Sequence, residues 1–116
     1  MEALELGKAL STFAIEKKAR QARLLDVGKL SSYTDYILIV SATSDRHACA
    51  LAEYLIEQLK RQKVRPLGTE GQDGGQWILL DYGVVIVHIF LESIRDYYDL
   101  DGLWTDAKSL PLEDNG

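Results

Sequence analysis

The stretch that decides the fold runs Trp77-Ile-Leu-Leu-Asp81-Tyr82-Gly83-Val84-Val-Ile-Val-His-Ile-Phe-Leu91. Its two apolar parts, Trp77–Asp81 and Val84–Phe90, are rich in the β-branched and large side chains that favour strands. Tyr82-Gly83 between them is typical of a tight turn, so the stretch predicts a β-hairpin. Because side chains alternate between the two faces of a strand, this hairpin has apolar residues on both faces.

Two helices and two extended segments are predicted before the hairpin. Apolar residues at helical spacing predict a helix from about Ala3 to Gln21, followed by a short extended piece at Leu24–Val27. Tyr36–Val40 is a β-branched and aromatic run bounded by polar residues, which predicts a buried strand. Ser44 is placed to cap a helix that ends before Pro66. The apolar face of that helix consists of Ala48, Leu51, Ala52, Leu55 and Leu59.

Shorter elements complete the chain. Leu67–Glu70 is predicted as a short strand and Gly71–Gly75 as a turn. Helical residues resume near Glu92, and residues 111–116 are expected to form a frayed tail. The predicted order is α-β-β-α-β-β-β-α, an α+β (α/β) fold in which residues 1–110 form a single domain with a five-stranded mixed sheet and three helices.

Three helices are few for the two faces of a five-stranded sheet. The chain's own helices can cover one face, which leaves part of the other for a partner, because large apolar patches seldom stay bare. On the Trp77–Asp81 strand, the side chains of Trp77, Leu79 and Asp81 share one face. The alternative is that the C-terminal helix alone covers this second face.

Length and composition indicate an ordinary globular protein. The chain has 116 residues, of which 47% are hydrophobic and 27% charged, and a domain of this size folds without disulfides. The apolar run Val84–Leu91 is too short to cross a bilayer. The first residues are acidic, unlike a signal peptide, and Cys49 is the single cysteine, so we expect a cytoplasmic protein that does not contact membranes. Cys49 itself is expected to pack as a small apolar residue.

The net charge of −5 is concentrated at the C-terminal end. Residues 1–91 contain eleven basic and eleven acidic residues, whereas residues 92–116 contain two basic and seven acidic ones. An acidic end repels phosphates, so direct nucleic-acid binding would need a local basic patch, and sequence-specific binding is not expected. A basic protein is the easier partner. The alternative is an acidic tail that only confers solubility.

The sequence carries no motif for catalysis or metal binding. His47 and His88 fall in different elements, and no C-x-x-C, H-E-x-x-H or Walker pattern occurs, so neither metal nor cofactor is expected. Ser41–Asp45, between a strand and a helix, is like the phosphate-binding turn of a nucleotidyltransferase. That chemistry also needs paired acids, yet Asp81 stands alone and Asp99-Leu-Asp101 lies in a helical segment. We therefore expect no enzymatic activity, with a small metal-dependent nucleotidyltransferase as the alternative.

Motifs spread along about residues 4–108 resemble those of one known family. In chain order they are Leu25-Asp26, Ser31-Ser-Tyr-Thr-Asp35, Thr43-Ser-Asp-Arg-His47, Glu70-Gly71, Trp77-Ile-Leu-Leu-Asp-Tyr-Gly83, Val87-His-Ile-Phe90, Arg95-Asp-Tyr-Tyr-Asp-Leu100 and Leu103-Trp104. Together they resemble the Iojap family of ribosomal silencing factors. Two positions depart from the family pattern: Ala42 stands where Gly is usual, which weakens the phosphate-site alternative, and Asp101-Gly102 replaces a pair that usually contains Glu.

The resemblance implies a nucleotidyltransferase-like fold that has lost catalysis. It implies a translational repressor that binds the large ribosomal subunit through its protein number fourteen and sterically blocks association with the small subunit, notably in nutrient limitation. It also implies a homodimer in the free state. A homodimeric regulator unrelated to the ribosome is the remaining alternative.

Six residues on and beside the hairpin are the candidate contacts with this partner. They are Trp77, Leu79, Asp81, His88, Leu67 and Tyr82. For Trp77 and Leu79 the competing interpretation is plain core packing, and for His88 it is a hydrogen-bonded structural role. A further apolar set at helix-like spacing is expected in the core or in a dimer interface rather than against the ribosome. That set consists of Tyr97, Tyr98, Leu100, Leu103 and Trp104.

Overall fold

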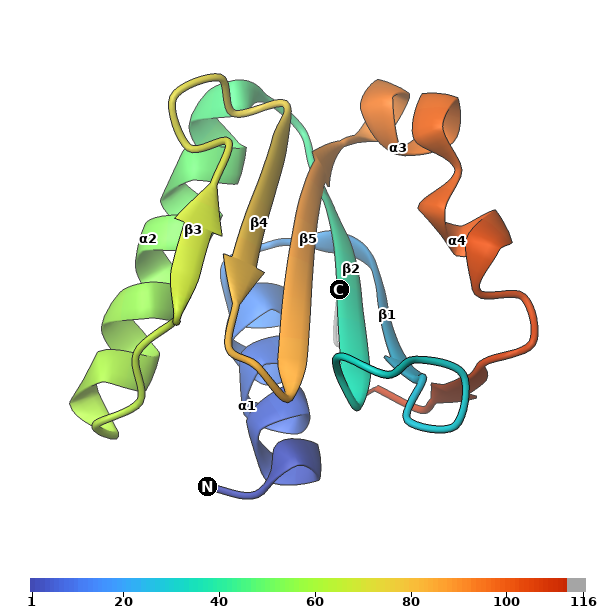
Figure 1. Ribbon diagram of the computed structural model, residues 1–116. Coiled ribbons are helices and arrows are strands. Elements are labelled where there is room, and N and C mark those ends of the chain that lie inside the picture. Colours follow the sequence, from blue (N-terminus) through green and yellow to red (C-terminus); the bar gives the residue numbers. More distant parts are fainter. Residues whose placement is uncertain (113–116) are drawn as a thin grey trace.

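A six-stranded sheet runs through the centre of the computed structural model, which describes residues 1–112 (Figure 1). The strands are β1 Arg20–Asp26, β2 Tyr36–Ala42, β3 Gly68–Glu70, β4 Trp77–Asp81, β5 Val85–Leu91 and β6 Lys108–Leu110. Their spatial order is β3-β4-β5-β2-β1-β6. β2 and β5 are parallel and the other neighbours are antiparallel, so the predicted mixed sheet and α+β fold class are confirmed.

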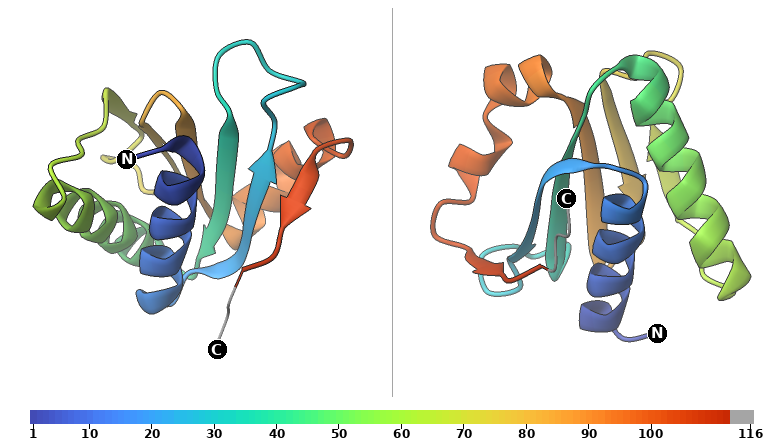
Figure 2. Two further views of the ribbon diagram at one scale, coloured as in Figure 1. Left: turned by 90° about the horizontal axis from the view of Figure 1, so that it is seen from below. Right: turned by 180° about the vertical axis from the view of Figure 1, so that it is seen from behind.

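Helices lie on both faces of the sheet. They are α1 Ala3–Glu16, α2 Asp45–Arg61, α3 Glu92–Tyr98 and the single turn α4 Leu100–Leu103. α1 and α2 lie side by side on one face, which we call the helix face, and α3 and α4 lie on the other, which we call the opposite face (Figure 2). In the part of the chain that the structure describes, no helix is long and apolar enough to span a membrane.

The helix α2 follows its sequence prediction closely. The Ser44 hydroxyl oxygen accepts a hydrogen bond of 3.0 Å from the His47 N–H, which confirms the predicted N-cap. The buried residues of the helix are the five predicted from its periodicity. Cys49, on the same helix, is a free cysteine that is half-buried against the core.

The predicted first helix is too long. Instead of continuing to Gln21, α1 ends at Glu16, and both Lys18 (φ 68°) and Gln21 (φ 49°) adopt left-handed backbone conformations. The conformation of Lys18 ends the helix and turns the chain into β1, whereas Gln21 lies within β1, where the register of its pairing with β2 shifts. The pairing fully buries Leu24 and Leu25, one on each face of the sheet, and a longer helix would have left β1 too short for this.

The prediction of five strands is wrong because it misses β6. This strand has three residues and pairs antiparallel with β1, with Leu110 opposite Leu24. A run so short has no period to detect, and only the free edge of β1 defines it as a strand. Of the expected frayed tail at 111–116, residues 113–116 lie outside the described part of the chain.

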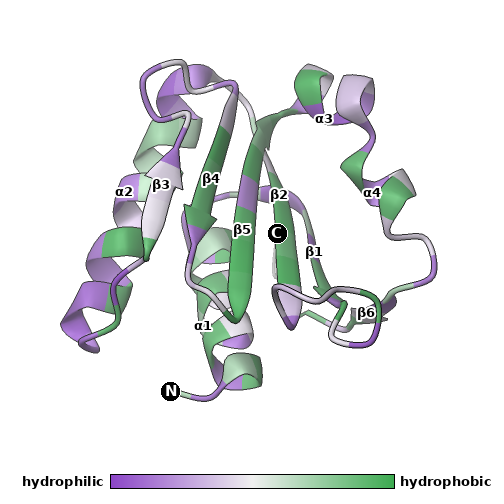
Figure 3. Cartoon of the chain, viewed as in Figure 1, coloured by the Kyte–Doolittle hydropathy of each residue, from purple (hydrophilic) through white to green (hydrophobic). Residues whose placement is uncertain are grey.

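The two faces of the sheet carry separate hydrophobic cores. The larger one lies between the sheet and the helices α1 and α2. The smaller one, on the opposite face, consists of Leu25, Val27, Ile37, Ile39 and Phe90. Figure 3 shows β2, β4 and β5 as largely hydrophobic strands, as expected when both faces of a sheet are apolar.

Candidate protein-binding surface

The C-terminal segment covers only one half of the opposite face. Ile94 on α3, Leu100 on α4 and Trp104 just after α4 pack against the smaller core, and so does Trp77 from β4. On the opposite face, no described helix lies over β3, β4 and the adjoining side of β5 (Figure 1). The C-terminal segment therefore does not cover the whole face, and coverage of the remaining half by a partner stays a prediction.

A buried arginine holds the C-terminal segment in place. Arg95 on α3 is 6% exposed, and its Nε and Nη2 donate to the two carboxylate oxygens of Asp101 at 3.0 and 2.9 Å. Arg95 Nη1 also donates to the Gln21 carbonyl at 2.6 Å and to the Ser41 hydroxyl at 3.0 Å. Arg23 Nη1 adds a further bond of 2.8 Å to Asp101. This network ties α3 and α4 to β1 and β2, away from β4.

The uncovered half presents a row of side chains that we call the exposed strip and define as Trp77, Leu79, Asp81, Ile86 and His88; the three on β4 are partly exposed, whereas Ile86 and His88 are each only 8% exposed. The strand register places Leu79 opposite His88 and Asp81 opposite Ile86, so all five side chains lie on the same face. Along β4, the residues of the strip are partly exposed, whereas the alternate residues are buried. The alternation predicted from the sequence is thus present, and it places Trp77, Leu79 and Asp81 together on the opposite face.

Trp77 forms the centre of an aromatic cluster. Its ring centroid lies 4.8 Å from Phe90, 4.9 Å from Tyr98 and 6.0 Å from His88. The indole Nε1–H donates to His88 Nδ1 at 3.0 Å, so the polar atom of Trp77 has a partner within the protein. The exposed part of the tryptophan is therefore apolar ring surface.

His88 has a structural role in this cluster. It is 8% exposed, and burial lowers its pKa to about 4, so the imidazole is neutral at physiological pH. Because Nδ1 accepts the proton of the Trp77 indole, the imidazole proton is on Nε2. His88 therefore orients Trp77 and contributes little exposed area of its own to the strip.

Leu67 and Tyr82 lie at the hairpin end of the strip, but on different sides of it. Leu67 is 78% exposed, and its N–H donates to the Asp81 carbonyl at 2.6 Å. The Asp81 carboxylate accepts the Gly83 N–H at 2.7 Å, which stabilises the turn. Tyr82 is 7% exposed and packs into the core of the helix face. Of the six candidate contacts, the structure places Trp77, Leu79, Asp81 and His88 on one face, joins Leu67 to Asp81 through a backbone hydrogen bond, and places Tyr82 behind the sheet.

The structure adds two tyrosines next to the strip. Tyr97 is 80% exposed and Tyr98 53% exposed, and the Tyr98 ring packs against Trp77 at an interplanar angle of 46°. Of the expected core or dimer packing, Leu100 and Trp104 pack against the smaller core, whereas Tyr97, Tyr98 and Leu103 are exposed, and their place in a dimer interface stays a prediction. Helical spacing alone cannot show which face of a short helix is exposed, because the Arg95 network sets the orientation of α3.

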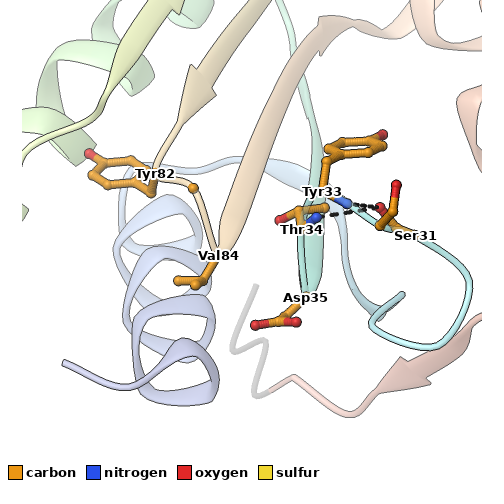
Figure 4. Close-up of a pocket in the computed structure, with 8 residues that line it drawn as sticks. Ser31, Tyr33, Thr34, Asp35, Tyr82 and Val84 are labelled. Carbon is orange, nitrogen blue, oxygen red and sulfur yellow. Dashed lines mark hydrogen bonds between the residues drawn. The ribbon is translucent and has the colours of Figure 1, made fainter.

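A shallow pocket lies where β2 begins, and it is a weaker candidate for a binding site. Ser31, Tyr33, Thr34, Asp35 and the hairpin from Tyr82 to Val84 are among its lining residues (Figure 4). The Ser31 hydroxyl accepts the N–H groups of Tyr33 and Thr34 at 3.2 and 3.4 Å. The Thr34 hydroxyl donates to the Tyr36 carbonyl at 3.3 Å. These hydroxyls shape the loop, and they do not converge on a ligand position.

The acidic residues considered for a nucleotidyltransferase site serve structural purposes. Asp99 caps α4 by accepting the Gly102 N–H, and Asp101 is held by Arg95 and Arg23. These hydrogen bonds, chiefly that from Arg95, lower the pKa of the Asp101 carboxyl below its ordinary value. Within residues 1–112, no group of His, Cys, Asp and Glu side chains is arranged to hold a metal ion.

Comparisons with known proteins give a consistent answer. The profile of the family described as "Ribosomal silencing factor during starvation" matches residues 1–116. The chain is 35% identical over 108 residues to "Ribosomal silencing factor RsfS" of Chromobacterium violaceum, covering 93% of this chain and 88% of that protein. It is 36% identical over 99 residues to the protein of the same name in Bacillus subtilis, covering 85% and 81%.

More distant relatives and solved structures agree. The chain is 29% identical over 111 residues to "Protein Iojap, chloroplastic" of Zea mays, covering 96% of this chain and 48% of that protein. A crystal structure of a Chromobacterium violaceum protein matches with a TM-score of 0.85 and 33% identity, covering 100% of this chain and 94% of that one. The resemblance noted in the sequence is thereby confirmed, and the chain belongs to the family of ribosomal silencing factors.

Proposed function

We propose that this protein is a translational repressor that binds the large ribosomal subunit and sterically blocks association with the small subunit, especially in nutrient limitation. The observation that carries the proposal is the exposed strip, a partly apolar sheet surface centred on Trp77 that the described helices leave uncovered. A silencing factor needs a surface for the ribosome, and exposed apolar patches on small proteins commonly serve as interaction sites.

The composition of the strip suits a protein partner. Trp77 and Tyr98 are of the residue types that dominate binding energy in protein interfaces, and Leu79 extends the apolar area. Asp81 and Glu70 supply polar groups at the rim. We propose protein number fourteen of the large subunit as the partner, in contact with Trp77, Leu79, Asp81, His88 and Leu67. Tyr82 supports the hairpin from behind.

Charge favours a basic partner on this surface. The acidic excess of the C-terminal segment lies beside the strip on α3 and α4, where Glu92, Asp96 and Asp99 are exposed. Such a flank attracts a basic ribosomal protein and accelerates its association at low ionic strength. The proposal therefore predicts an association rate that falls as salt is added.

The remaining expectations belong to the same proposal. The free protein is a homodimer that uses the strip for self-association, works in the cytoplasm, has a nucleotidyltransferase-like fold and catalyses no reaction. The structural contacts of Asp99 and Asp101 support the absence of catalysis. The strand–helix turn that Ser44 caps supports the nucleotidyltransferase-like fold. Calorimetry with magnesium and nucleoside triphosphates should show no heat of binding.

Sedimentation tests the proposal directly. Purified protein is added to a mixture of free subunits and assembled ribosomes, which is then separated on a density gradient. We expect the protein to sediment with large subunits and the fraction of assembled ribosomes to fall. Recovery only at the top of the gradient, or equal binding to assembled ribosomes, would contradict the proposal.

A further inference from the structure

A cluster of basic side chains lies at the end of α2, on the segment that leads to the edge strand β3. We define it as the basic turn, Lys60, Arg61, Lys63 and Arg65, where α2 ends and the chain leads to β3. All four side chains are exposed. The turn is at the lower left of Figure 1, and Figure 3 shows this end of α2 as strongly hydrophilic.

The local backbone directs these side chains outward. The Val64 side chain points toward the protein interior and packs against the larger hydrophobic core, and its N–H donates to the Leu59 carbonyl at 2.9 Å. Lys63 has a left-handed conformation, with φ 64°. Cations at Lys60 and Arg61 complement the negative end of the helix dipole. Lys63 and Arg65 lie beyond the last turn of α2, so stabilisation of the helix does not explain why these two positions are basic.

Little negative charge compensates the basic turn. Among the described residues, its one ion pair joins Arg61 to Glu57 at 3.8 Å, with side chains that are 68% and 57% exposed, and such a surface pair contributes little. The acidic excess lies on α3 and α4. The end of α2 and the pair α3 and α4 lie toward opposite sides of the molecule, with β4 and β5 between them (Figure 1).

We propose that the basic turn binds phosphates of ribosomal RNA on the large subunit, next to the protein that occupies the strip. This inference rests on the proposed function. Flexible lysines and an arginine fork are suited to phosphate oxygens, and three of the four have no ion-pair partner among residues 1–112. The basic turn contains no aromatic residue on which a base could stack, so the contact is with the RNA backbone and independent of sequence.

The test measures affinity for two targets at several salt concentrations. The variant carries Lys60→Gln, Lys63→Gln and Arg65→Gln. The matched control carries Lys8→Gln, Lys18→Gln and Lys29→Gln, three exposed lysines outside the turn with no described ion pair. The targets are purified large subunits and isolated ribosomal protein number fourteen. Circular dichroism and thermal unfolding verify that both variants fold.

We expect the turn variant to bind large subunits at least about tenfold more weakly at low salt. The slope of log affinity against log salt should become shallower by about two to three, which is close to one for each phosphate that the variant no longer binds. Binding to the isolated protein should stay unchanged, and the control should behave as the wild type.

Three results would overturn the inference. They are wild-type binding by the turn variant, an equal weakening in the control, and an equal weakening toward the isolated protein, which would assign the turn to a protein contact. Failure of the wild-type protein to bind large subunits would instead refute the proposed function itself, so the two failures are distinguishable.

Discussion

Trp77 and His88 form one unit, because the histidine accepts the indole proton and both rings pack against Phe90. The unit depends on a neutral imidazole, since a protonated Nδ1 could not accept the bond. His88 is surrounded by Leu79 and Ile39 on the neighbouring strands, which carry no charge to stabilise an imidazolium. A histidine in this position makes the surface sensitive to acid.

The first prediction concerns stability against pH. Burial lowers the pKa of His88 to about 4 from its ordinary value of 6.5, so the unfolded chain binds more protons between these values. The contribution of His88 is therefore complete above pH 6.5 and is lost as the pH falls toward 4, by about 3 kcal/mol. Urea denaturation should show this fall in the wild type and a much smaller one in His88→Gln. An unchanged pH dependence in the variant would show that another group titrates.

The turn between β3 and β4 positions Trp77 through its backbone. Gly71 has φ 82°, and a Cβ there would collide with the Trp77 carbonyl oxygen. Gly74, in the same turn, has no atom within 4 Å of the position that a Cβ would take. The two glycines therefore form a matched pair.

Gly71→Ala is expected to lower the free energy of unfolding by at least about 2 kcal/mol and to weaken ribosome binding, because the turn and Trp77 must shift. Gly74→Ala should leave both quantities close to the wild type. Thermal unfolding and gradient sedimentation measure the two effects. Equal behaviour of the two variants would contradict this role of the turn.

The C-terminal segment depends on the ion pair between Arg95 and Asp101. Replacing Asp101 with Asn leaves the buried guanidinium without its carboxylate, which should cost about 3 kcal/mol of stability. We expect hydrogen exchange to accelerate across residues 92–110 in Asp101→Asn. Asp106→Asn, an exposed control, should change stability by less than about 0.5 kcal/mol. If exchange in this segment were unaffected, the network would not be what holds it.

Elements with a clear period were predictable from the sequence. The buried face of α2, its Ser44 cap and the strands β4 and β5 follow from spacing alone. The end of α1 was not predictable from the sequence. It depends on the left-handed backbone of Lys18, and no glycine stands at that position to indicate such a conformation. The strand β6 and the exposure of Tyr98 depend on long-range partners, β1 and Arg95, which local patterns do not contain.

The whole molecule is asymmetric, and the asymmetry defines its candidate surface. The C-terminal segment covers β1 and β2, whereas β3, β4 and part of β5 remain uncovered among the described elements. The sequence predicted correctly that Trp77, Leu79 and Asp81 share a face, because a strand has a period of two. It could not place Tyr82 behind the sheet, since turn residues follow no such period.

The central claim is that the exposed strip binds the large ribosomal subunit. Equilibrium binding of labelled Trp77→Ala to purified large subunits tests it most directly, with Leu4→Ala, a 39% exposed leucine on α1, as control. Trp77→Ala should stay folded and lose at least about 2 kcal/mol of binding, roughly thirtyfold, while the control binds normally. Wild-type affinity in a folded Trp77→Ala protein would rule out the strip as the ribosome-binding surface, and so would unfolding of that variant, which would assign Trp77 to the core.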